Sequence, residues 1–323
     1  MLGHLISRLF GANANSSKFR VALFNDTRSD RHHGCDIVIS EIERRLTASE
    51  ATITWRHSVG TDWRQIFPNR PQFDIMIVNG EGTIHHSATR QRASLLASVG
   101  PLSKSIGIPA FLINASLYEI DDRTAKHLHD FDGIWVRESQ SAKHLKSHGI
   151  DSEVVPDLTL GRKYTIASTK RKGIVGTDSV LKNISQVIET RCKGERWPLL
   201  PILHRYKHIK NDKRAAEYAN RLSRHRLVVT GRFHVVALCI ATHTPFVAVE
   251  SNTPKISALL RDVFGDTRRI IDIPVVASFA HSDFDFWTQK EYTAIQSYLR
   301  YAERATARMT DEIRSVLYSI RLS

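Results

Sequence analysis

The sequence predicts an α/β protein in which two doubly wound domains face each other across a central cleft, followed by C-terminal helices. Three observations predict this class. Short apolar runs alternate with amphipathic stretches, one polar and basic stretch interrupts this alternation near the middle, and the final segment contains no further apolar run of strand type. Alternating strand and helix patterns are typical of βα units on a parallel sheet. With 323 residues, the chain is long enough for two domains of ordinary size.

The first half of the chain contains six apolar runs that predict strands, with amphipathic stretches between most of them. Ser139 is suited to the N-cap of the last helix in this half, and Gly149 to the position just after its end. The predicted strands are 19–24, 53–58, 73–79, 109–114, 133–136 and 153–155, and the predicted helices are 36–46, 88–106, 123–129 and 139–148.

A polar and basic stretch without periodicity, residues 161–173, marks the predicted domain boundary. We therefore expect a first domain over 1–165, a second over 166–285 and a helical tail over 286–323. The tail predicts one or two basic amphipathic helices, which we expect to pack back across the first domain. In the second domain the predicted strands are 173–176, 199–203, 227–230, 246–249 and 269–273, and the predicted helices are 183–191, 212–223, 234–241 and 254–264.

The composition favours a soluble protein of a reducing compartment, which predicts a cytoplasmic location. No apolar run reaches the length of a transmembrane helix, and the first ten residues are too interrupted for a secretory signal. The cysteines, Cys35, Cys192 and Cys239, form neither a disulfide framework nor a CxxC pair.

The chain is strongly basic, with 46 Lys and Arg against 33 Asp and Glu and a formal net charge of +13. Such an excess favours anionic partners: nucleic acid, an anionic membrane face, or phosphorylated and carboxylated substrates. No zinc-finger spacing, RNP aromatic pattern or GxxG clamp accompanies the charge, so we expect no nucleic-acid partner. A generally basic surface without a dedicated partner would give the same composition.

The strongest candidate site lies where an apolar strand, 227–230, turns through Gly231 directly into an apolar helix. Arg232 and His234 stand at this junction, where free backbone N–H groups and the positive end of the helix attract anions. Arginine offers a planar fork for phosphate or carboxylate, and histidine can bind the same anion or donate a proton. The alternative is a surface arginine beside a helix-capping histidine.

Glu81 is the candidate catalytic carboxylate, because it lies in a glycine-rich turn, 79–83, at the end of a predicted strand. A carboxylate there, beside His85 and His86, can act as a general acid or base if its surroundings tune its pKa. Alternatively, Glu81 caps the next helix or holds the loop around Asn25 by a hydrogen bond.

Basic residues at the end of one predicted strand and at the start of one predicted helix are also candidate anion contacts. His204 and Arg205 follow the predicted strand 199–203 and can bind a donor anion or an acidic glycan. Lys255 stands at the start of a predicted helix and offers a second anion contact. Solvated basic side chains would give the same pattern at each position.

A metal site is not expected, although several imidazole and thiolate side chains occur close together in the sequence. Adjacent histidines do not easily converge on one ion, and no CxxC or HExxH spacing is present. The residues considered were His32, His33, Cys35, His85 and His86.

Several short segments, taken together and in this order, resemble the polysaccharide pyruvyl transferase family. Gly231-Arg232-Phe233-His234, an apolar helix and then Thr253-Pro254-Lys255 are similar to the family's C-terminal signature. The upstream matches are Asn25-Asp26 with Gly34-Cys35-Asp36, the turn 79–83, Trp135-Val136-Arg137-Glu138-Ser139 and Val155-Pro156-Asp157.

The resemblance implies two Rossmann-like domains that face a central cleft, as in the GT-B glycosyltransferases. It also implies transfer of a pyruvyl group from phosphoenolpyruvate to two hydroxyls of a sugar, forming a cyclic ketal, with no separate cofactor. By position, Arg232 and His234 would hold the donor's phosphate and carboxylate, and Arg137 would reach the cleft from the opposite side. We assign Glu81 and His234 to catalysis, Arg137, Arg232, His234, His204, Arg205 and Lys255 to donor binding, and Asn25, Asp26, His85 and His86 to acceptor binding.

The implied partners are phosphoenolpyruvate and a saccharide or lipid-linked saccharide, with peripheral association at the inner face of the membrane. Val235 follows the histidine where the family pattern has glycine, and a β-branched side chain restricts how closely a ligand approaches that turn. One alternative is therefore a GT-B-like glycosyltransferase that uses an acidic nucleotide-activated sugar. Another is a catalytically lapsed relative that binds anionic glycans.

Overall fold

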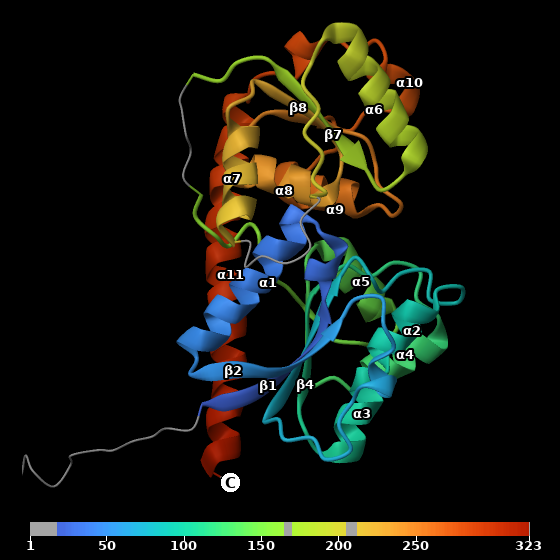
Figure 1. Cartoon of the computed structure of the whole chain (residues 1–323), viewed down its shortest axis with the longest axis vertical. Helices are drawn as coiled ribbons and strands as arrows, with labels where there is room; N and C mark the ends of the chain where they lie inside the picture. Colours follow the sequence, from blue (N-terminus) through green and yellow to red (C-terminus); the bar gives the residue numbers. More distant parts are fainter. Residues whose placement is uncertain (1–17, 165–169, 205–211, 323) are drawn as a thin grey trace, which may run out of the picture.

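The computed structural model describes residues 18–164, 170–204 and 212–322. Within these ranges the chain forms two parallel sheets, one above the other in Figure 1. The larger sheet has the strand order β2-β1-β3-β4-β5-β6. Its strands are β1 (Phe19–Asp26), β2 (Ala51–Ser58), β3 (Ile75–Glu81), β4 (Ala110–Ala115), β5 (Gly133–Val136) and β6 (Glu153–Val154).

The strand order of the larger sheet creates a crevice at one edge. The chain passes from β1 to β2 on one side and then to β3 on the other side of β1, so the connections diverge between β1 and β3. Parallel sheets bind ligands at such a point, beyond the carboxyl ends of the strands. Asp26 and Glu81 end these two strands, so the sheet itself brings the candidate residues around them to this crevice.

The smaller sheet has the order β7-β8-β9 and corrects two strand predictions. The predicted strands 199–203 and 269–273 are wrong, since only single parallel bridges form, Gly176 to Leu199 and Ala248 to Ile270. Pro198 and Pro201 cannot donate ladder hydrogen bonds, which limits the first of these segments to a bridge. The strands are β7 (Ile174–Ser179), β8 (Leu227–Gly231) and β9 (Phe246–Ala248).

Helices cover both faces of each sheet, which confirms the α/β class. The single helix predicted over 88–106 is in fact two, because Pro101 has no N–H to continue the helix past Ser98. The helices of the larger sheet are α1 (His33–Ala48), α2 (Gln91–Ala97), α3 (Val99–Ile106), α4 (Asp122–Leu128) and α5 (Ser139–Ser147). Those of the smaller sheet are α6 (Lys182–Glu195), α7 (Asp212–Ser223), α8 (Phe233–Ala241), α9 (Lys255–Phe264) and α10 (Ile273–Val276).

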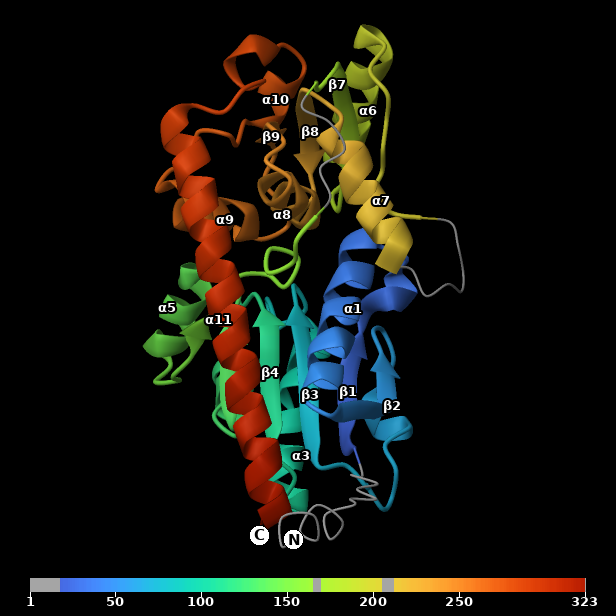
Figure 2. The same cartoon turned by 90° about the vertical axis from the view of Figure 1, so that its left-hand side faces the viewer.

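The tail forms one long helix, α11 (Gln289–Leu322), that joins the two halves of the molecule. Figures 1 and 2 show it running beside both sheets. Ile295 and Ala302 are buried in the core of the smaller sheet, whereas Met309 and Ile313 are buried against the larger one. The prediction that the tail packs across the first domain is therefore confirmed. No helix in the described part of the chain is both long and apolar enough to cross a bilayer.

Arg269 and Glu291 anchor the start of α11. The Arg269 guanidinium is 1% exposed, and its Nε donates to Glu291 Oε1 at 2.6 Å. Its other N–H groups donate to the backbone carbonyls of Phe246, Phe284 and Phe286. Burial raises the pKa of Glu291, but hydrogen bonds from Arg269 and the exposed Arg268 outweigh it and lower the pKa to about 2.

Arg269→Met is expected to destabilise the protein by about 3 kcal/mol, because it leaves a buried carboxylate without its main partner. Arg268→Gln removes an exposed partner of the same carboxylate and should cost less than about 1 kcal/mol. Since folding lowers the pKa of Glu291, its contribution is present above pH 4.5 and is lost as the pH falls towards 2. Urea unfolding of both variants from pH 7 down to pH 3 checks this. Equal losses in the two variants would contradict it.

Candidate functional site

The candidate site is built on three neighbouring strand ends with unusual backbone geometry. Asn25, Glu81 and Asn114 lie at or next to the carboxyl ends of β1, β3 and β4, and all have positive φ, at 63°, 47° and 55°. Left-handed conformations are uncommon outside glycine and persist where the surroundings hold them. These three strained backbone positions therefore lie at the same edge of the larger sheet, around the crevice between β1 and β3.

A ladder of asparagines holds this edge together. Asn25 Nδ2 donates to the Asn79 carbonyl at 2.6 Å, and Asn79 Nδ2 returns a hydrogen bond to the Asn25 carbonyl at 3.3 Å. Asn114 Nδ2 donates to Asn79 Oδ1 at 3.4 Å, and Asn114 Oδ1 accepts from the Leu158 N–H at 3.2 Å. The ladder thus fixes the ends of three strands relative to the loop that carries Asp157.

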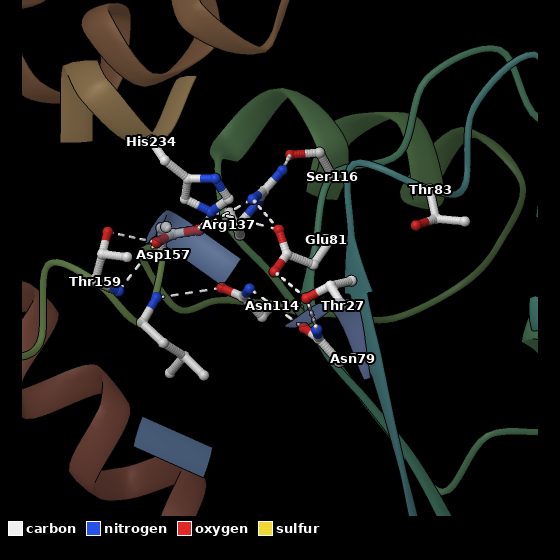
Figure 3. A network of polar contacts seen from close by, with 12 residues as sticks. Thr27, Asn79, Glu81, Thr83, Asn114, Ser116, Arg137, Asp157, Thr159 and His234 are labelled. Atoms are coloured by element: carbon white, nitrogen blue, oxygen red, sulfur yellow. Dashed lines mark hydrogen bonds and ion pairs between the residues drawn. The ribbon is translucent and has the colours of Figure 1, made fainter. Parts of the chain in front are cut away.

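Four charged or titratable side chains converge above the ladder, as Figure 3 shows. His234 Nε2, at the start of α8, lies 3.4 Å from Glu81 Oε2 and 3.6 Å from Asp157 Oδ2. Arg137, just after β5, places Nη1 3.0 Å from Asp157 Oδ2 and 3.7 Å from Glu81 Oε2. The sheets therefore meet in a group of two carboxylates, one guanidinium and one imidazole.

Each carboxylate in this group is held by a different set of donors. Glu81 Oε1 accepts from the Thr27 hydroxyl at 3.1 Å, so its other oxygen faces His234. Asp157 Oδ1 accepts from both the N–H and the hydroxyl of Thr159, at 3.0 and 2.5 Å. Burial raises the pKa of Asp157, but the charges of His234 and Arg137 and the Thr159 hydrogen bond outweigh it, so the pKa is lowered. Asp157 is therefore a permanently charged anchor.

Arg137 is the central cation of the site and is 1% exposed. Its Nε and Nη2 both donate to Ser116 Oγ, at 3.0 and 2.7 Å. Its guanidinium also lies over the Phe233 ring of the other half of the molecule, 4.3 Å from the ring centroid. These contacts orient the guanidinium and hold it between the two sheets.

Gly82 lies between two cations. A Cβ built on Gly82 would stand 3.4 Å from Lys255 Nζ and 3.8 Å from Arg137 Nη2. Gly82, Ser116, Glu138, Thr253 and Lys255 are among the residues that line a small pocket of about 10 Å³ here. Burial and the Arg137 charge lower the pKa of Lys255 to about 8. The two cations on either side of Gly82 make this position a candidate anion site.

Gly82→Ala is expected to weaken anion binding in this pocket by about tenfold, because the methyl group takes ligand space between the two cations. Both contacts are at ordinary van der Waals distance and φ is not positive, so the fold should tolerate the change. Gly194→Ala, where a Cβ meets nothing within 4 Å, is the matched control. Titration with phosphoenolpyruvate measures the effect. Equal affinity in both variants would place the anion elsewhere.

The other face of the His234 ring packs against the start of α1. A Cβ on Gly34 would fall 2.3 Å from His234 Cγ, so only glycine permits this approach. The His32 ring lies edge-on to His234, with centroids 5.1 Å apart. Burial, followed by the charge of His234, lowers the pKa of His32 well below its ordinary value. The neutral His32 accepts from the Gly34 N–H through Nδ1, which caps α1.

Two predicted anion contacts already have carboxylate partners in the structure. Arg232 directs Nε and Nη2 at Asp178 Oδ2, with Nε at 2.8 Å. His204 Nε2 lies 2.9 Å from Asp36 Oδ2. Arg205 falls outside the described residues.

The predicted acceptor residues lie at the same edge of the sheet but in separate contacts. Asn25 belongs to the asparagine ladder, and Asp26 pairs with Arg28 and Arg56. His85 contacts Arg90 Nη1, and Asn252 approaches its Nε2 at 3.4 Å from the other half of the molecule. Burial and the charge of Arg90 lower the pKa of His85 to about 3, so its ring is neutral at physiological pH. His86 Nε2 lies 3.2 Å from Glu119.

Sequence reasoning missed several residues that complete the site. Ser116 follows a predicted strand, and Asp178 ends β7 at the corresponding edge of the smaller sheet. Both positions are of the kind that supplies ligands in parallel sheets, which is the signal that could have identified them.

The predicted N-cap of α5, Ser139, is wrong. Glu138 holds that position without a side-chain cap, and Asp262 from α9 accepts the Ser139 N–H at 2.7 Å.

Two groups of candidate metal ligands occur among the described residues: His32, Cys35 and His234, and His33, Asp36 and His204. Their ligand atoms lie within 4.8 Å of one another. The adjacent histidines belong to different groups. Positive charges of Arg232 and Lys255 act on the first group, and those of Arg221 and Arg214 on the second. We derive no step through a metal at either group.

Comparisons with known proteins identify the family. None of the curated proteins compared matches the chain. A putative UDP-N-acetylglucosamine 2-epimerase from Listeria monocytogenes is 12% identical with a TM-score of 0.53, covering 94% of this chain and 98% of its own. The UDP-GlcNAc 2-epimerase from Neisseria meningitidis, solved bound to UDP-GlcNAc, is 10% identical with a TM-score of 0.46, covering 87% and 98%. The Listeria structure confirms the GT-B-like fold of two Rossmann-like halves.

The family assignment rests on a match to most of the chain. The family model described as polysaccharide pyruvyl transferase matches residues 19–253, which include every member of the group around His234. This match confirms the resemblance carried by the short motifs. The protein belongs to the polysaccharide pyruvyl transferase family, a family of transferases.

Proposed function

We propose that the protein transfers a pyruvyl group from phosphoenolpyruvate to two hydroxyls of a sugar in a surface polysaccharide or its precursor, forming a cyclic ketal. The observation that supports this most is the position of His234. Its Nε2 is buried against the Glu81 and Asp157 carboxylates, in the group that also contains Arg137. A proton-transfer group thus stands beside an anion pocket, which is what a carboxylated and phosphorylated enol donor requires.

The donor's two anionic groups match the cations of the pocket. Phosphoenolpyruvate carries a phosphate ester and a carboxylate on the same carbon, and Gly82 is flanked by Lys255 Nζ and Arg137 Nη2. Arg137 has a planar fork and a fixed position, which suits a carboxylate, whereas Lys255 is a compact charge on a flexible stem that suits phosphate. With the donor held in this way, we expect its enol carbons to face Glu81 and His234.

The chemistry balances with the groups present. His234 gives a proton to the methylene carbon, and the first sugar hydroxyl forms a bond to the adjacent carbon while Glu81 takes its proton. Glu81 then returns this proton to His234, whose Nε2 is 3.4 Å away. The second hydroxyl attacks the same carbon, the bond to phosphate breaks, and the second proton leaves with phosphate. The products are a pyruvyl ketal and inorganic phosphate.

Asp157 has a positioning role in this scheme. One of its oxygens accepts two hydrogen bonds from Thr159 and the other accepts from Arg137, so neither is available to take a substrate proton. Its fixed negative charge instead stabilises the protonated His234 and holds Arg137 in place.

The proposal is tested by incubating the protein with phosphoenolpyruvate and a panel of saccharides and lipid-linked saccharides. We expect an acceptor whose mass rises by one pyruvate less one water, with release of one phosphate. A thermal-shift panel separates the alternatives, since phosphoenolpyruvate should raise the melting temperature. Stabilisation by nucleotide sugars but not by phosphoenolpyruvate would instead indicate a glycosyltransferase, and stabilisation by neither would indicate a lapsed relative.

A further inference from the structure

Arg232 is the basic residue that marks the candidate site most clearly in the sequence, yet the structure commits its side chain to Asp178. Both Nε and Nη2 point at Asp178 Oδ2, so the fork that would grip an anion already holds a carboxylate. Arg232 follows β8 directly and Asp178 is the second-last residue of β7, so both lie at the carboxyl ends of neighbouring strands. Asp178 in turn accepts the Ile202 N–H through Oδ1, at 2.9 Å. Each carboxylate oxygen therefore has a partner.

The segment held by Asp178 forms a backbone clasp between the two halves of the molecule. We define the clasp as residues 202–204 paired with 31–33. The His33 N–H donates to the Ile202 carbonyl at 3.2 Å, and the His204 N–H donates to the Arg31 carbonyl at 2.8 Å. An antiparallel bridge joins His32 to Leu203 between them. Figure 2 shows the upper end of α1 directly below α7 of the smaller half.

The clasp is connected to His234 through the start of α1. It fixes the first residues of α1, and the next residue, Gly34, lies against the His234 ring with no room for a side chain. His234 is two residues beyond Arg232 on the same chain segment. The contacts therefore close a ring from Arg232 through Asp178, Ile202 and the start of α1 to His234.

We propose that Arg232 and Asp178 are positioning residues that set the place of His234 through the clasp. This inference rests on the proposed function for its catalytic consequence, but the clasp itself is a property of the fold. The ion pair neutralises Arg232, and a donor that took its fork would have to displace Asp178 and free the Ile202 N–H.

The test uses Asp178→Asn, Arg232→Gln and the double variant in the full chain. In each, we expect amide hydrogen exchange at His33 and His204 to quicken by about tenfold, because the ion pair no longer holds residue 202. We expect kcat to fall by about 10- to 100-fold, the effect of a small misplacement of His234, with the Kd for phosphoenolpyruvate changed less than about threefold. The double variant should be no worse than either single one, because both break the same contact.

The matched control is Arg226→Gln. Arg226 pairs with Asp285 at 3.1 Å at the opposite end of β8, so it should change neither exchange at the clasp nor turnover. Two results would overturn the proposal. One is unchanged exchange at His33 and His204 in the variants. The other is tighter phosphoenolpyruvate binding in Asp178→Asn with loss of binding in Arg232→Gln, which would make Arg232 a direct donor contact. If the wild-type protein binds no phosphoenolpyruvate, the proposed function fails, while the exchange result still decides whether the clasp depends on this ion pair.

Discussion

His234→Asn is expected to lower kcat by about 10²- to 10⁴-fold, because it removes the group that protonates the donor's methylene carbon. The Kd for phosphoenolpyruvate should change little, since in the proposed site Arg137 and Lys255 provide the charge that binds the donor. Asparagine is smaller than histidine, so it fits against Gly34 and leaves Glu81 and Asp157 in their hydrogen bonds to Thr27 and Thr159. Steady-state kinetics together with donor titration separates the two effects.

A second histidine provides the matched control for this experiment. His243 follows α8 in the same half of the molecule and has φ of 54°, a conformation that asparagine tolerates well. His243→Asn should therefore fold and turn over like the wild type. If His234→Asn kept activity within about threefold of this control, His234 would not be the proton donor.

Lys255→Met is expected to abolish phosphoenolpyruvate binding and, at the same time, to stabilise the ligand-free protein by about 1–2 kcal/mol. Burial and the nearby Arg137 charge lower the pKa of Lys255 to about 8, which means that the folded state holds this ammonium at a cost. Methionine removes that cost. Thermal unfolding with and without phosphoenolpyruvate measures both changes. A variant that is less stable than the wild type, or that keeps its ligand shift, would show that Lys255 has another role.

The pH dependence of phosphoenolpyruvate binding provides a second test of the role of Lys255. Lys255 is charged below pH 8, so donor binding should be strong there and weaken by up to about tenfold per pH unit above 8. Lys255→Arg keeps its charge throughout this range and should remove the loss. Binding that is flat from pH 7 to 9.5 in the wild type would contradict the assignment.

Much of the fold is readable from the sequence because the strands of the larger sheet are buried and apolar. The segments that failed, 199–203 and 269–273, lie next to β7 and β9 and make only isolated bridges, at Leu199, Leu203 and Ile270. Their apolar residues pack like those of a strand, and apolar periodicity does not reveal whether a ladder forms. For the segment 199–203, Pro198 and Pro201 are the residues that argue against a strand, because proline cannot donate a ladder hydrogen bond.

The candidate site was predictable only where a motif coincides with a strand end. Glu81, Arg137 and His234 were identified in this way, and the structure brings them together with Asp157. What remained hidden was the pairing of charges between distant segments. Nothing local to Arg232 indicates that Asp178, 54 positions earlier, occupies its fork. A strand-end arginine was therefore interpreted as an anion contact, although the anion that it meets in the structure belongs to the protein.

The most direct test of the proposed site is calorimetric titration of phosphoenolpyruvate into the wild-type protein and into Lys255→Met at pH 7. We expect one donor bound per chain in the wild type and no binding in the variant, because the pocket over Gly82 would lose one of its two cations. No heat from phosphoenolpyruvate in the wild type, or equal binding in both proteins, would contradict a donor site between Lys255 and Arg137.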